Sequence, residues 1–381
     1  MYLDTLLLRQ FRSYNELFLK VHPGVNLFLG LNASGKTNLL EAIAVLTTGM
    51  SPRGAETESL IQWSEKGFYI RGTFQDQAQE RDELTLEMKF EVGSSRVIRE
   101  NGKALVRLKD LIGRIPIVSF VPEDLAMIKG EPDLRRRALN LILMQVDRVY
   151  VSALKKYHEA LRSRNAALRQ VREGDVESEA LDPWDQAVVE LGLSLCQKRN
   201  EFISDFSERV STVHERISGG KEKLTLVYRP SFSGPWDKEA ASRRWHEKMM
   251  ALRSQEVALG LTMVGPHRDD VEFLINGRMA RHYASEGQRR TSALAFKLAE
   301  LPYIQEKRGV RPLCLLDDVL SELDMERATH LLNELSQTGQ CFVTLTGLES
   351  WPKDQALPAT IFQVDEKGVL ARDNETVLSR S

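Results

Sequence analysis

Residues 30–37 decide the fold, and they read Gly30-Leu31-Asn32-Ala33-Ser34-Gly35-Lys36-Thr37. The stretch fits the pattern G-x-x-x-x-G-K-[ST], in which glycines let the backbone turn so that successive N–H groups face a phosphate. A short apolar run over 25–29 precedes it, and residues 38–46 follow with helical spacing. A strand, a glycine-rich loop and a helix in this order predict a phosphate-binding loop, because the helix N-terminus also attracts anions.

The pattern gives individual residues a role. Lys36 would add a charge at the β- and γ-phosphate oxygens and would count as catalytic, and Thr37 would offer its hydroxyl to Mg²⁺. We therefore expect a nucleotide and Mg²⁺ as ligands. The predicted nucleotide contacts are Gly30, Asn32, Ala33, Ser34, Gly35, Lys36, Thr37 and Asn38.

A pair of carboxylates, Asp317 and Asp318, ends the apolar run 313–316. One acid at the end of a buried strand can hold Mg²⁺, and a second can orient or deprotonate the attacking water. By itself, a strand that ends in Asp-Asp is more often an ordinary exit into a loop. Together with a phosphate loop it favours a site, and we assign Asp317 to the metal and Asp318 to catalysis.

A second anion site is predicted where a helix begins after Ser285. This serine would cap a helical run that extends to Leu301, so that the N–H groups of the first turn would face outward. Taken alone, the pattern is typical of a plain capped surface helix. Its position upstream of the acidic strand end, with Ser-Glu-Leu-Asp over 321–324 directly after that strand, favours an anion site.

Length and composition limit the class of protein. The 381 residues suggest two or three domains, and a net charge of −2 (52 Lys and Arg against 54 Asp and Glu) excludes a uniformly basic coat for nucleic acid. Three cysteines without a CxxC pair argue against a disulfide scaffold or a zinc ribbon and fit a reducing cytosol. We find no signal peptide and no apolar stretch long enough to span a membrane, and we expect a cytoplasmic, nucleoid-associated protein.

The order of elements predicts an α/β protein with an inserted helical domain. Strand-and-helix alternation covers 1–122 and returns over 262–381, and between them 123–261 reads as mainly helical. Residues 133–172 contain no Pro or Gly, and further helices are expected over 182–217 and 237–259. Leu139, Leu143, Val146, Val149 and Leu154 would share one helix face.

The ordered set of motifs resembles the ABC-type ATPases. More narrowly it resembles their SMC-like branch, in which an arm interrupts the ATPase head, and within that branch the RecF family of bacterial DNA repair proteins. The Walker loop is generic, whereas Gly-Pro-His-Arg-Asp-Asp and Ser-Glu-Gly-Gln-Arg-Arg are specific. The stretches that carry the resemblance are 11–14, 30–43, 120–125, 265–270, 285–290 and 316–324.

This resemblance implies further site residues. In the family two heads close face to face around two ATP molecules, so Ser285, Gly287 and Gln288 of one subunit would meet the nucleotide of the other, with Asp324 near the same junction. Arg12 would contact the nucleotide and is better placed by its motif than Arg53, whose Ser-Pro-Arg context departs from the expected Ser-His-Arg. In place of the switch histidine of transporters, Thr346 would act as a weak γ-phosphate sensor.

The resemblance also implies a function. We expect an ATP-dependent homodimeric clamp or switch on duplex or gapped DNA that acts in replication, recombination and the response to DNA damage. It would help RecO/RecR-type mediators load the RecA recombinase. Slow, DNA-stimulated hydrolysis would release it, because Asp318 stands where many ABC ATPases have Glu.

DNA contacts are expected in the insertion. Residues 129–172 hold eleven Lys and Arg against four Asp and Glu. A solvated helix face is the usual explanation of such a run, and most of the support for DNA comes from the resemblance. No base-reading motif is visible, so binding without sequence specificity is expected. The candidates are Arg135, Arg136, Arg137, Lys155, Lys156, Arg162 and Arg164.

Three alternatives stay open. The chain could be the nucleotide-binding subunit of a membrane transporter, although the arm is long and basic for that class. It could be a chromosome-organising SMC-like protein, although the arm is too short for a distant hinge. It could be a scaffold with a vestigial ATP site, although Lys36, Thr37, Asp317 and Asp318 are intact.

Overall fold

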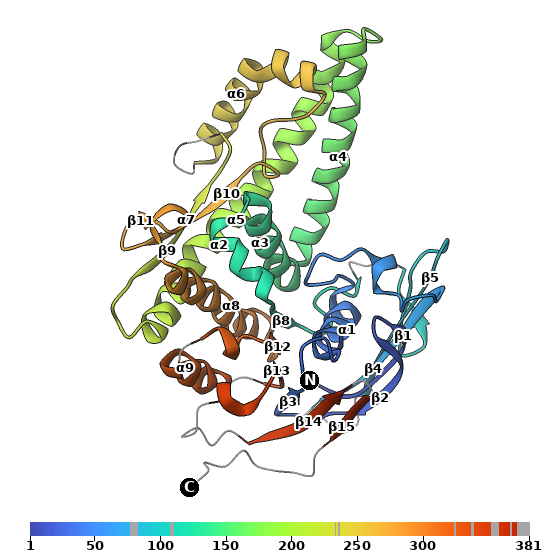
Figure 1. Cartoon of the computed structure of the whole chain (residues 1–381). Helices are drawn as coiled ribbons and strands as arrows, with labels where there is room; N and C mark the ends of the chain where they lie inside the picture. Colours follow the sequence, from blue (N-terminus) through green and yellow to red (C-terminus); the bar gives the residue numbers. More distant parts are fainter. Residues whose placement is uncertain are drawn as a thin grey trace. The chain divides into compact units, whose positions relative to one another are not determined.

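The computed structural model divides the chain into two compact units (Figure 1). Unit 1 comprises Met1–Leu125, Arg216–Gly219 and Leu294–Ser381, and unit 2 comprises Ala126–Glu215 and Gly220–Ala293. The structure describes residues 1–76, 83–106, 110–232, 234, 237–323, 325–336, 339–351, 358–365 and 368–371.

A six-stranded sheet in unit 1 carries the phosphate loop. Its order is β15-β14-β3-β13-β12-β8, and all neighbours pair in parallel except the edge strand β15. Every residue of the three central strands is buried, as expected for a parallel sheet covered on both faces. The strands are β3 (Val25–Leu29), β8 (Ile117–Phe120), β12 (Leu313–Asp317), β13 (Cys341–Leu345), β14 (Ala359–Asp365) and β15 (Gly368–Ala371).

The other six-stranded sheet of unit 1 is antiparallel, with the order β2-β1-β4-β5-β6-β7. Its strands alternate buried and exposed residues, and helix α1 (Lys36–Thr48) contacts strands of both sheets. The buried helix face and the two inner sheet faces form one apolar core. The strands are β1 (Tyr2–Phe11), β2 (Tyr14–Lys20), β4 (Gly67–Gln75), β5 (Glu83–Glu91), β6 (Val97–Glu100) and β7 (Lys103–Ala104).

Short helices complete unit 1. A single-turn helix η1 (Thr57–Leu60) follows α1, a second, η3 (Pro122–Leu125), follows β8, and α9 (Met325–Ser336) connects β12 to β13. Helix α8 (Glu286–Arg308) begins in unit 2 and continues into unit 1 from Leu294.

Unit 2 is mainly helical, as predicted for the insertion, and also holds a three-stranded sheet with the order β11-β10-β9. The predicted helix over 182–217 is present as α5 (Asp182–Ile217), and the one over 237–259 as α6 (Lys238–Leu259). The other elements are α2 (Ala126–Lys129), α3 (Pro132–Val146), α4 (Arg148–Glu173), η4 (Ser178–Leu181), β9 (Leu224–Arg229), β10 (Asp270–Ile275), β11 (Arg278–Met279) and α7 (Ala280–Tyr283).

The long helical stretch after residue 133 is interrupted at Asp147. Its backbone is extended, and its carboxylate accepts hydrogen bonds from the N–H groups of Val149 and Tyr150, which begins α4 as a new helix. Lys198 pairs with the same carboxylate. The shared apolar face predicted from Leu139 to Leu154 is therefore wrong across this break, and Val149 is 66% exposed.

The chain also returns to unit 1 later than predicted. We expected the return at residue 262, whereas the structure has it at Leu294. The reason is strand pairing: β10 pairs along its whole length with β9, from Asp270 opposite Arg229 to Ile275 opposite Leu224. Residues 262–293 therefore pack with the helical insertion.

The Gly-Pro-His-Arg-Asp-Asp stretch forms the polar centre of unit 2. Asp269 is 1% exposed and accepts hydrogen bonds from the hydroxyl of Tyr228, the backbone N–H of Ser231 and the thiol of Cys196. Burial raises the pKa of Asp269, and the guanidinium of Arg199, 3.7 Å away, opposes the rise. The specific motif therefore ties β9, α5 and the start of β10 together.

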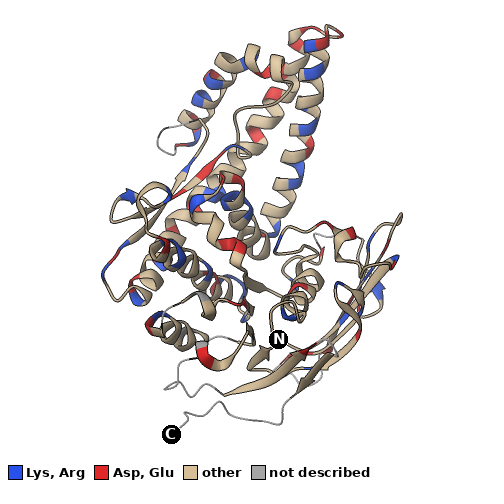
Figure 2. Cartoon of the chain, in the orientation of Figure 1, with Lys and Arg blue, Asp and Glu red and all other residues tan. Residues whose placement is uncertain are grey.

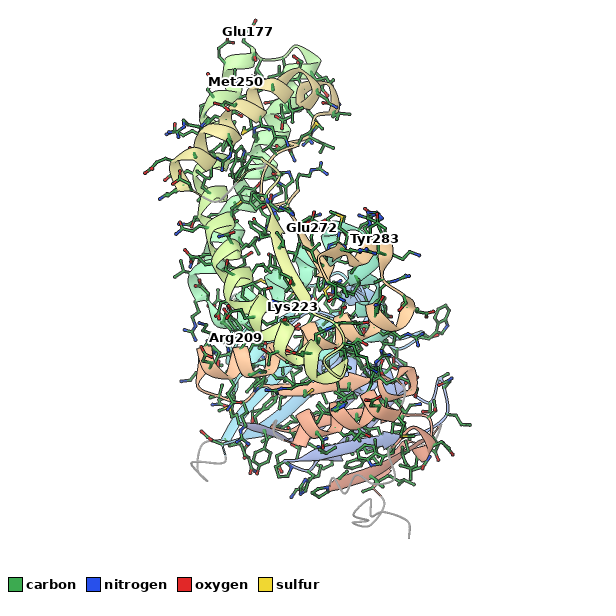
Figure 3. The ribbon with its side chains drawn as sticks, turned by 90° about the vertical axis from the view of Figure 1, so that its left-hand side faces the viewer. Glu177, Arg209, Lys223, Met250, Glu272 and Tyr283 are labelled. Atoms are coloured by element: carbon green, nitrogen blue, oxygen red, sulfur yellow. The ribbon has the colours of Figure 1, made fainter. Side chains whose placement is uncertain are left out.

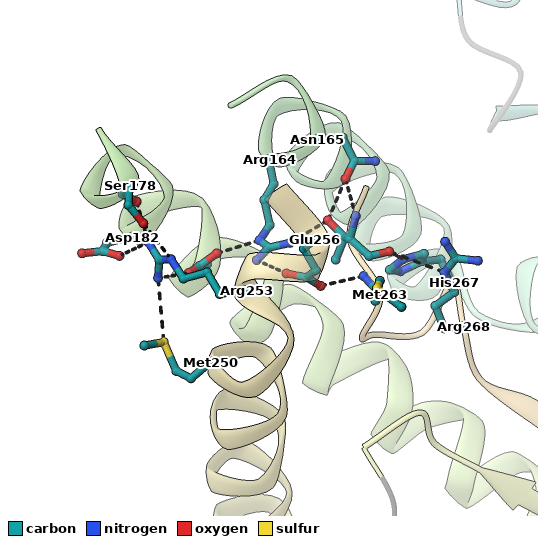
Figure 4. A network of polar contacts seen from close by, with 12 residues as sticks. Arg164, Asn165, Ser178, Asp182, Met250, Arg253, Glu256, Met263, His267 and Arg268 are labelled. Atoms are coloured by element: carbon teal, nitrogen blue, oxygen red, sulfur yellow. Dashed lines mark hydrogen bonds and ion pairs between the residues drawn. The ribbon is translucent and has the colours of Figure 1, made fainter. Parts of the chain in front are cut away.

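A second buried network lies beside it (Figure 4). The guanidinium of Arg164 donates to Asp185 at 2.6 Å, to Glu256 at 2.7 Å and to Thr262 Oγ1 at 2.8 Å. The carbonyl of Thr262 lies 3.0 Å from Nε2 of His267. These bonds join α4, α5 and α6 to the segment that leads into β10.

His267 is held as a neutral ring. A carbonyl can only accept, so Nε2 carries the proton toward Thr262, and Nδ1 accepts from the hydroxyl of Tyr157 at 2.6 Å. Burial lowers the pKa of His267 to about 4, with the nearby Arg268 adding to the effect. His267 thus takes part in the buried hydrogen-bond network of unit 2 through both ring nitrogens.

The low pKa of His267 predicts a loss of stability in mild acid. An unfolded histidine titrates near pH ~6.5, so between that pH and the folded value of about 4 the unfolded chain binds the extra proton. The free energy of unfolding therefore keeps the full contribution of His267 above pH ~6.5. As the pH falls toward ~4, that free energy decreases by up to about 3 kcal/mol. Thermal unfolding of His267→Gln between pH 4 and 8 should show a shallower pH dependence than the parent chain. The exposed His246→Gln is the control, and equal slopes for His267→Gln and the parent would contradict the expectation.

Candidate nucleotide-binding site

The phosphate loop lies between β3 and α1, as predicted. Gly30 begins it, and its N–H donates to the carbonyl of Leu345 at 3.2 Å. A Cβ on Gly30 would lie 2.2 Å from the carbonyl oxygen of Val364, so no larger residue fits beside β14. Gly35 adopts φ 104°, a left-handed conformation that only glycine adopts at no steric cost, and the helix begins with the next residue.

Lys36 is 6% exposed and lies over the loop. Its ammonium donates to the carbonyls of Gly30 at 2.6 Å and Leu31 at 2.8 Å. Burial lowers the pKa of Lys36, while Asp318 and Asp317 oppose this change. In the same loop the hydroxyl oxygen of Ser34 is buried and has no hydrogen-bond partner among the described residues. A lysine and an unsatisfied hydroxyl in one glycine-rich turn fit an oxyanion ligand.

Asp317 joins the loop to the end of β12. The hydroxyls of Thr37 and Thr344 donate to the same carboxylate oxygen, at 2.9 Å and 2.8 Å. Asp317 is 4% exposed, and burial raises its pKa against the effect of both threonines. Hydroxyl and carboxylate oxygens are the donors that Mg²⁺ prefers, so this pair fits the metal that the motif implies. Across the described parts of the chain no cluster of three or more His, Cys, Asp or Glu could hold a metal. Mg²⁺ in nucleotide sites is commonly held by one or two protein oxygens together with waters and substrate phosphates.

Asp318 leaves the strand in a left-handed turn, with φ 52°. Its backbone N–H donates to Thr344 Oγ1 at 2.9 Å, and its carboxylate accepts from Ser321 Oγ at 2.5 Å. Thr344, which pairs opposite Asp317 in β13, thus contacts both acids, through the carboxylate of Asp317 and the backbone of Asp318.

These side chains line one cavity of about 230 Å³. The cavity brings together six residues of the loop and α1, the two acids Asp317 and Asp318, and Thr344. All of these except Thr344 are site residues predicted from the sequence. The cavity also includes Arg53 and not Arg12. The lining consists of Asn32, Ala33, Gly35, Lys36, Thr37, Asn38, Arg53, Asp317, Asp318 and Thr344.

Arg12, which is half-buried, instead forms an ion pair with a buried glutamate. Its guanidinium donates twice to the carboxylate of Glu41, at 2.8 Å and 3.0 Å, and once to the carbonyl of Ser59 at 2.8 Å. Glu41 is 1% exposed and also accepts from Ser51 Oγ at 2.5 Å. In this structure Arg12 therefore holds α1 through Glu41, whereas Arg53 lines the cavity.

Glu41 also fixes the segment that carries Arg53. The backbone N–H of Arg53 donates to Ser51 Oγ at 3.2 Å, and its guanidinium donates to Glu123 at 3.1 Å. Neither Glu41 nor Thr344 was expected from the sequence. Two signals in the sequence could have indicated these residues. Glu41 is a charged residue on the apolar face of a predicted helix, and Thr344 lies at the end of an apolar strand. Thr346, the proposed γ-phosphate sensor, is exposed and does not line the cavity.

The predicted N-cap of α8 is confirmed in unit 2. The N–H of Gln288 donates to Ser285 Oγ at 3.2 Å, and the N–H of Ser285 donates to Gln288 Oε1 at 2.8 Å. This reciprocal pair is a capping box. Ser285 is exposed and Gly287 half-buried, whereas Asp324 lies outside the described residues.

Two of the candidate DNA contacts are wrong. Arg164 is 0% exposed inside the network with Asp185 and Glu256, and Arg135 is 5% exposed in a bidentate pair with Asp270. A buried guanidinium that holds carboxylates cannot also neutralise DNA phosphates. Arg136 is half-buried and donates to the carbonyl of Asp269.

The remaining candidates are exposed: Arg137, Lys155, Lys156 and Arg162. The last three lie on α4, along which Figure 2 shows Lys and Arg in blue. Among the helices that the structure describes, none has the length and apolar character that a membrane span requires.

Comparisons with known proteins identify the family of the chain. The family model described as RecF/RecN/SMC N terminal domain matches residues 2–363. A DNA replication and repair protein RecF from Heliobacterium modesticaldum is 36% identical over 378 residues, covering 98% of this chain and 100% of the relative. The protein of the same name from Halalkalibacterium halodurans is 38% identical over 368 residues, covering 96% of this chain and 98% of the relative.

Solved structures of RecF also resemble this chain. The structure described as the recombination mediator protein RecF-ATP in the RecFOR pathway has a TM-score of 0.89 and 32% identity, and covers 97% of each chain. The corresponding RecF-ATPrS structure has a TM-score of 0.87 and 32% identity, covering 97% of this chain and 98% of that chain. An Smc head bound to the C-terminal winged-helix domain of ScpA, at 17% identity and a TM-score of 0.55 over 98% of both chains, shares the fold. With the phosphate loop, the acidic strand end and the capped helix all in place, the chain belongs to the RecF family.

Proposed function

We propose that this protein binds and hydrolyses ATP as a homodimeric switch on DNA during replication and recombinational repair. The observation that carries the proposal is the single cavity in which Lys36, Thr37, Asp317 and Asp318 meet. Its full-length relatives are named DNA replication and repair proteins. That naming favours the repair role over a transporter subunit, and the intact cavity argues against a vestigial site.

The residues that line the cavity would have different roles in binding and hydrolysis of ATP. Backbone N–H groups of the loop and the ammonium of Lys36 bind the phosphates. Thr37 and Asp317 would hold Mg²⁺, which when bound neutralises phosphate charge. Asp318, held by Ser321 and Thr344, orients the attacking water and accepts its proton. Hydrolysis is slow because the carboxylate of Asp318 is one methylene shorter than that of Glu.

The capped start of α8 supports dimerisation. Ser285 uses its hydroxyl oxygen in the capping box, and its hydroxyl proton remains as a donor, together with the first-turn N–H groups. We propose that Ser285 and Gly287 bind the γ-phosphate held by the second subunit. Hydrolysis then removes this interaction, and the dimer opens. RecO/RecR-type mediators and RecA are the proposed partners of the closed state.

The two arginines near the cavity predict different effects. Arg53→Ala should weaken ATP binding about tenfold with little change in melting temperature, since one charge-assisted hydrogen bond to the nucleotide disappears. Arg12→Ala should instead destabilise the chain by about 3 kcal/mol, because it leaves the carboxylate of Glu41 buried without its cationic partner. Calorimetric titration with ATP measures the change in affinity, and thermal unfolding measures the change in stability. Lys36→Ala, which should no longer bind ATP, is the control. Normal ATP binding by Lys36→Ala would overturn the site assignment.

Ser285→Arg tests the dimer. A bulky cation in the phosphate site should abolish doubling of the mass with a non-hydrolysable ATP analogue and leave ATP binding by the monomer unchanged. Light scattering with apo, ADP and analogue-bound protein, with and without gapped duplex, measures this. Ser254→Arg on the exposed face of α6 is the matched control. Normal dimers of Ser285→Arg would contradict the face-to-face arrangement.

DNA binding is tested by charge reversal on α4. Lys155, Lys156 and Arg162, each changed to Glu, should together weaken duplex binding and reduce the slope of log affinity against log salt by about one unit for each phosphate that is no longer neutralised. Fluorescence anisotropy over a salt series measures the slope. The exposed Lys20→Glu in β2 is the control, and an unchanged slope in the triple variant would exclude α4 as the DNA-binding helix.

A further inference from the structure

The capping box of α8 continues into a second carboxylate. Gln288 uses its amide oxygen to accept from the N–H of Ser285, and its amide nitrogen donates to Glu222 Oε1 at 2.8 Å. An ionised carboxylate can only accept hydrogen bonds. Glu222 therefore binds the NH₂ end of the Gln288 amide and leaves the carbonyl end facing Ser285.

Glu222 comes from a segment whose backbone is well fixed. It lies between two glycines with left-handed backbones, Gly219 and Gly220, and the start of β9. The next residue, Lys223, donates its N–H to the side chain of Asn276 at 2.9 Å and accepts from the N–H of Asn276 at 2.9 Å. Lys223 is labelled in Figure 3 at the start of this strand. The carboxylate thus approaches α8 from the end of a sheet.

A buried histidine, His214, lies next to the carboxylate of Glu222. His214 is 0% exposed, and its Nε2 lies 3.8 Å from Glu222 Oε2 and 3.5 Å from Ser292 Oγ. Ser292 is also 0% exposed and donates to the carbonyl of Gln288 at 2.8 Å. Glu222 thus contacts the side chain of Gln288 and Ser292 contacts its backbone, while His214 lies beside both Glu222 and Ser292.

We propose that Glu222 is a positioning residue for the γ-phosphate contact of Ser285. This inference rests on the proposed dimer. Glu222 fixes which end of the Gln288 amide faces Ser285, the capping box then fixes the Ser285 side chain, and its hydroxyl proton is presented to the nucleotide of the second subunit. Without Glu222 the amide of Gln288 rotates freely and the cap loosens, although every residue of the capping box is still present.

The first test is Glu222→Ala in the full chain. We expect the ATP-analogue-dependent dimer to weaken by about tenfold, the loss that accompanies a missing helix cap of about 1.4 kcal/mol. ATP binding by the monomer should be unchanged. Glu222→Gln keeps an acceptor for the amide of Gln288 and should restore dimerisation to within about threefold of the parent chain. Lys221→Ala, an exposed change in the same segment, is the matched control.

A second measurement tests the effect of Glu222 on the capping box in the absence of the dimer. Hydrogen exchange of the apo monomer should show faster exchange at the N–H groups of Ser285 and Gln288 in Glu222→Ala, with exchange in β9 and β10 unchanged. Unchanged exchange at both groups overturns the positioning role. Faster exchange in the variant, together with a parent chain that never dimerises, would show that Glu222 holds the capping box and would reject the proposed dimer, and with it the γ-phosphate contact.

Discussion

The structure of the nucleotide-binding site depends on one oxygen atom, Oδ1 of Asp317. Thr37 from the start of α1 and Thr344 from the end of β13 both donate to it. One carboxylate thus joins three elements that are far apart in the sequence, at the edge of the sheet where parallel strands end. Open α/β sheets bind their ligands at this edge. The buried strands supply stability, and the shared oxygen sets the position of the loop relative to the acids.

Much of this site could be predicted because its signals are local. The spacing from Gly30 to Thr37 requires a particular backbone shape, and an apolar run that ends in two acids requires a particular strand end. The capping box at Ser285 is likewise encoded within four residues, and the order of motifs along the chain identified the fold and the family.

Contacts over long sequence separations could not be predicted in the same way. The motif favoured Arg12 for the nucleotide, but nothing local revealed that Glu41 would take its guanidinium. The basic run in 129–172 likewise concealed two arginines, Arg135 and Arg164, whose carboxylate partners lie on other elements. The return to unit 1 was placed too early because β9 and β10 are separated by a whole helix. The helix break at Asp147 was also missed, but it differs from these contacts. An aspartate that can cap a new helix in the middle of an apolar pattern is a local signal, so this break could have been predicted.

The two carbonyls that Lys36 holds have a thermodynamic consequence. The two carbonyls already accept hydrogen bonds from the ammonium of Lys36. A ligand that binds this ammonium must therefore replace these hydrogen bonds with new ones. A weakly charged anion gains little from such an exchange, whereas a polyphosphate that also engages the loop N–H groups gains at several points at once. The two existing hydrogen bonds of Lys36 would thus favour a ligand with several phosphates over a small anion.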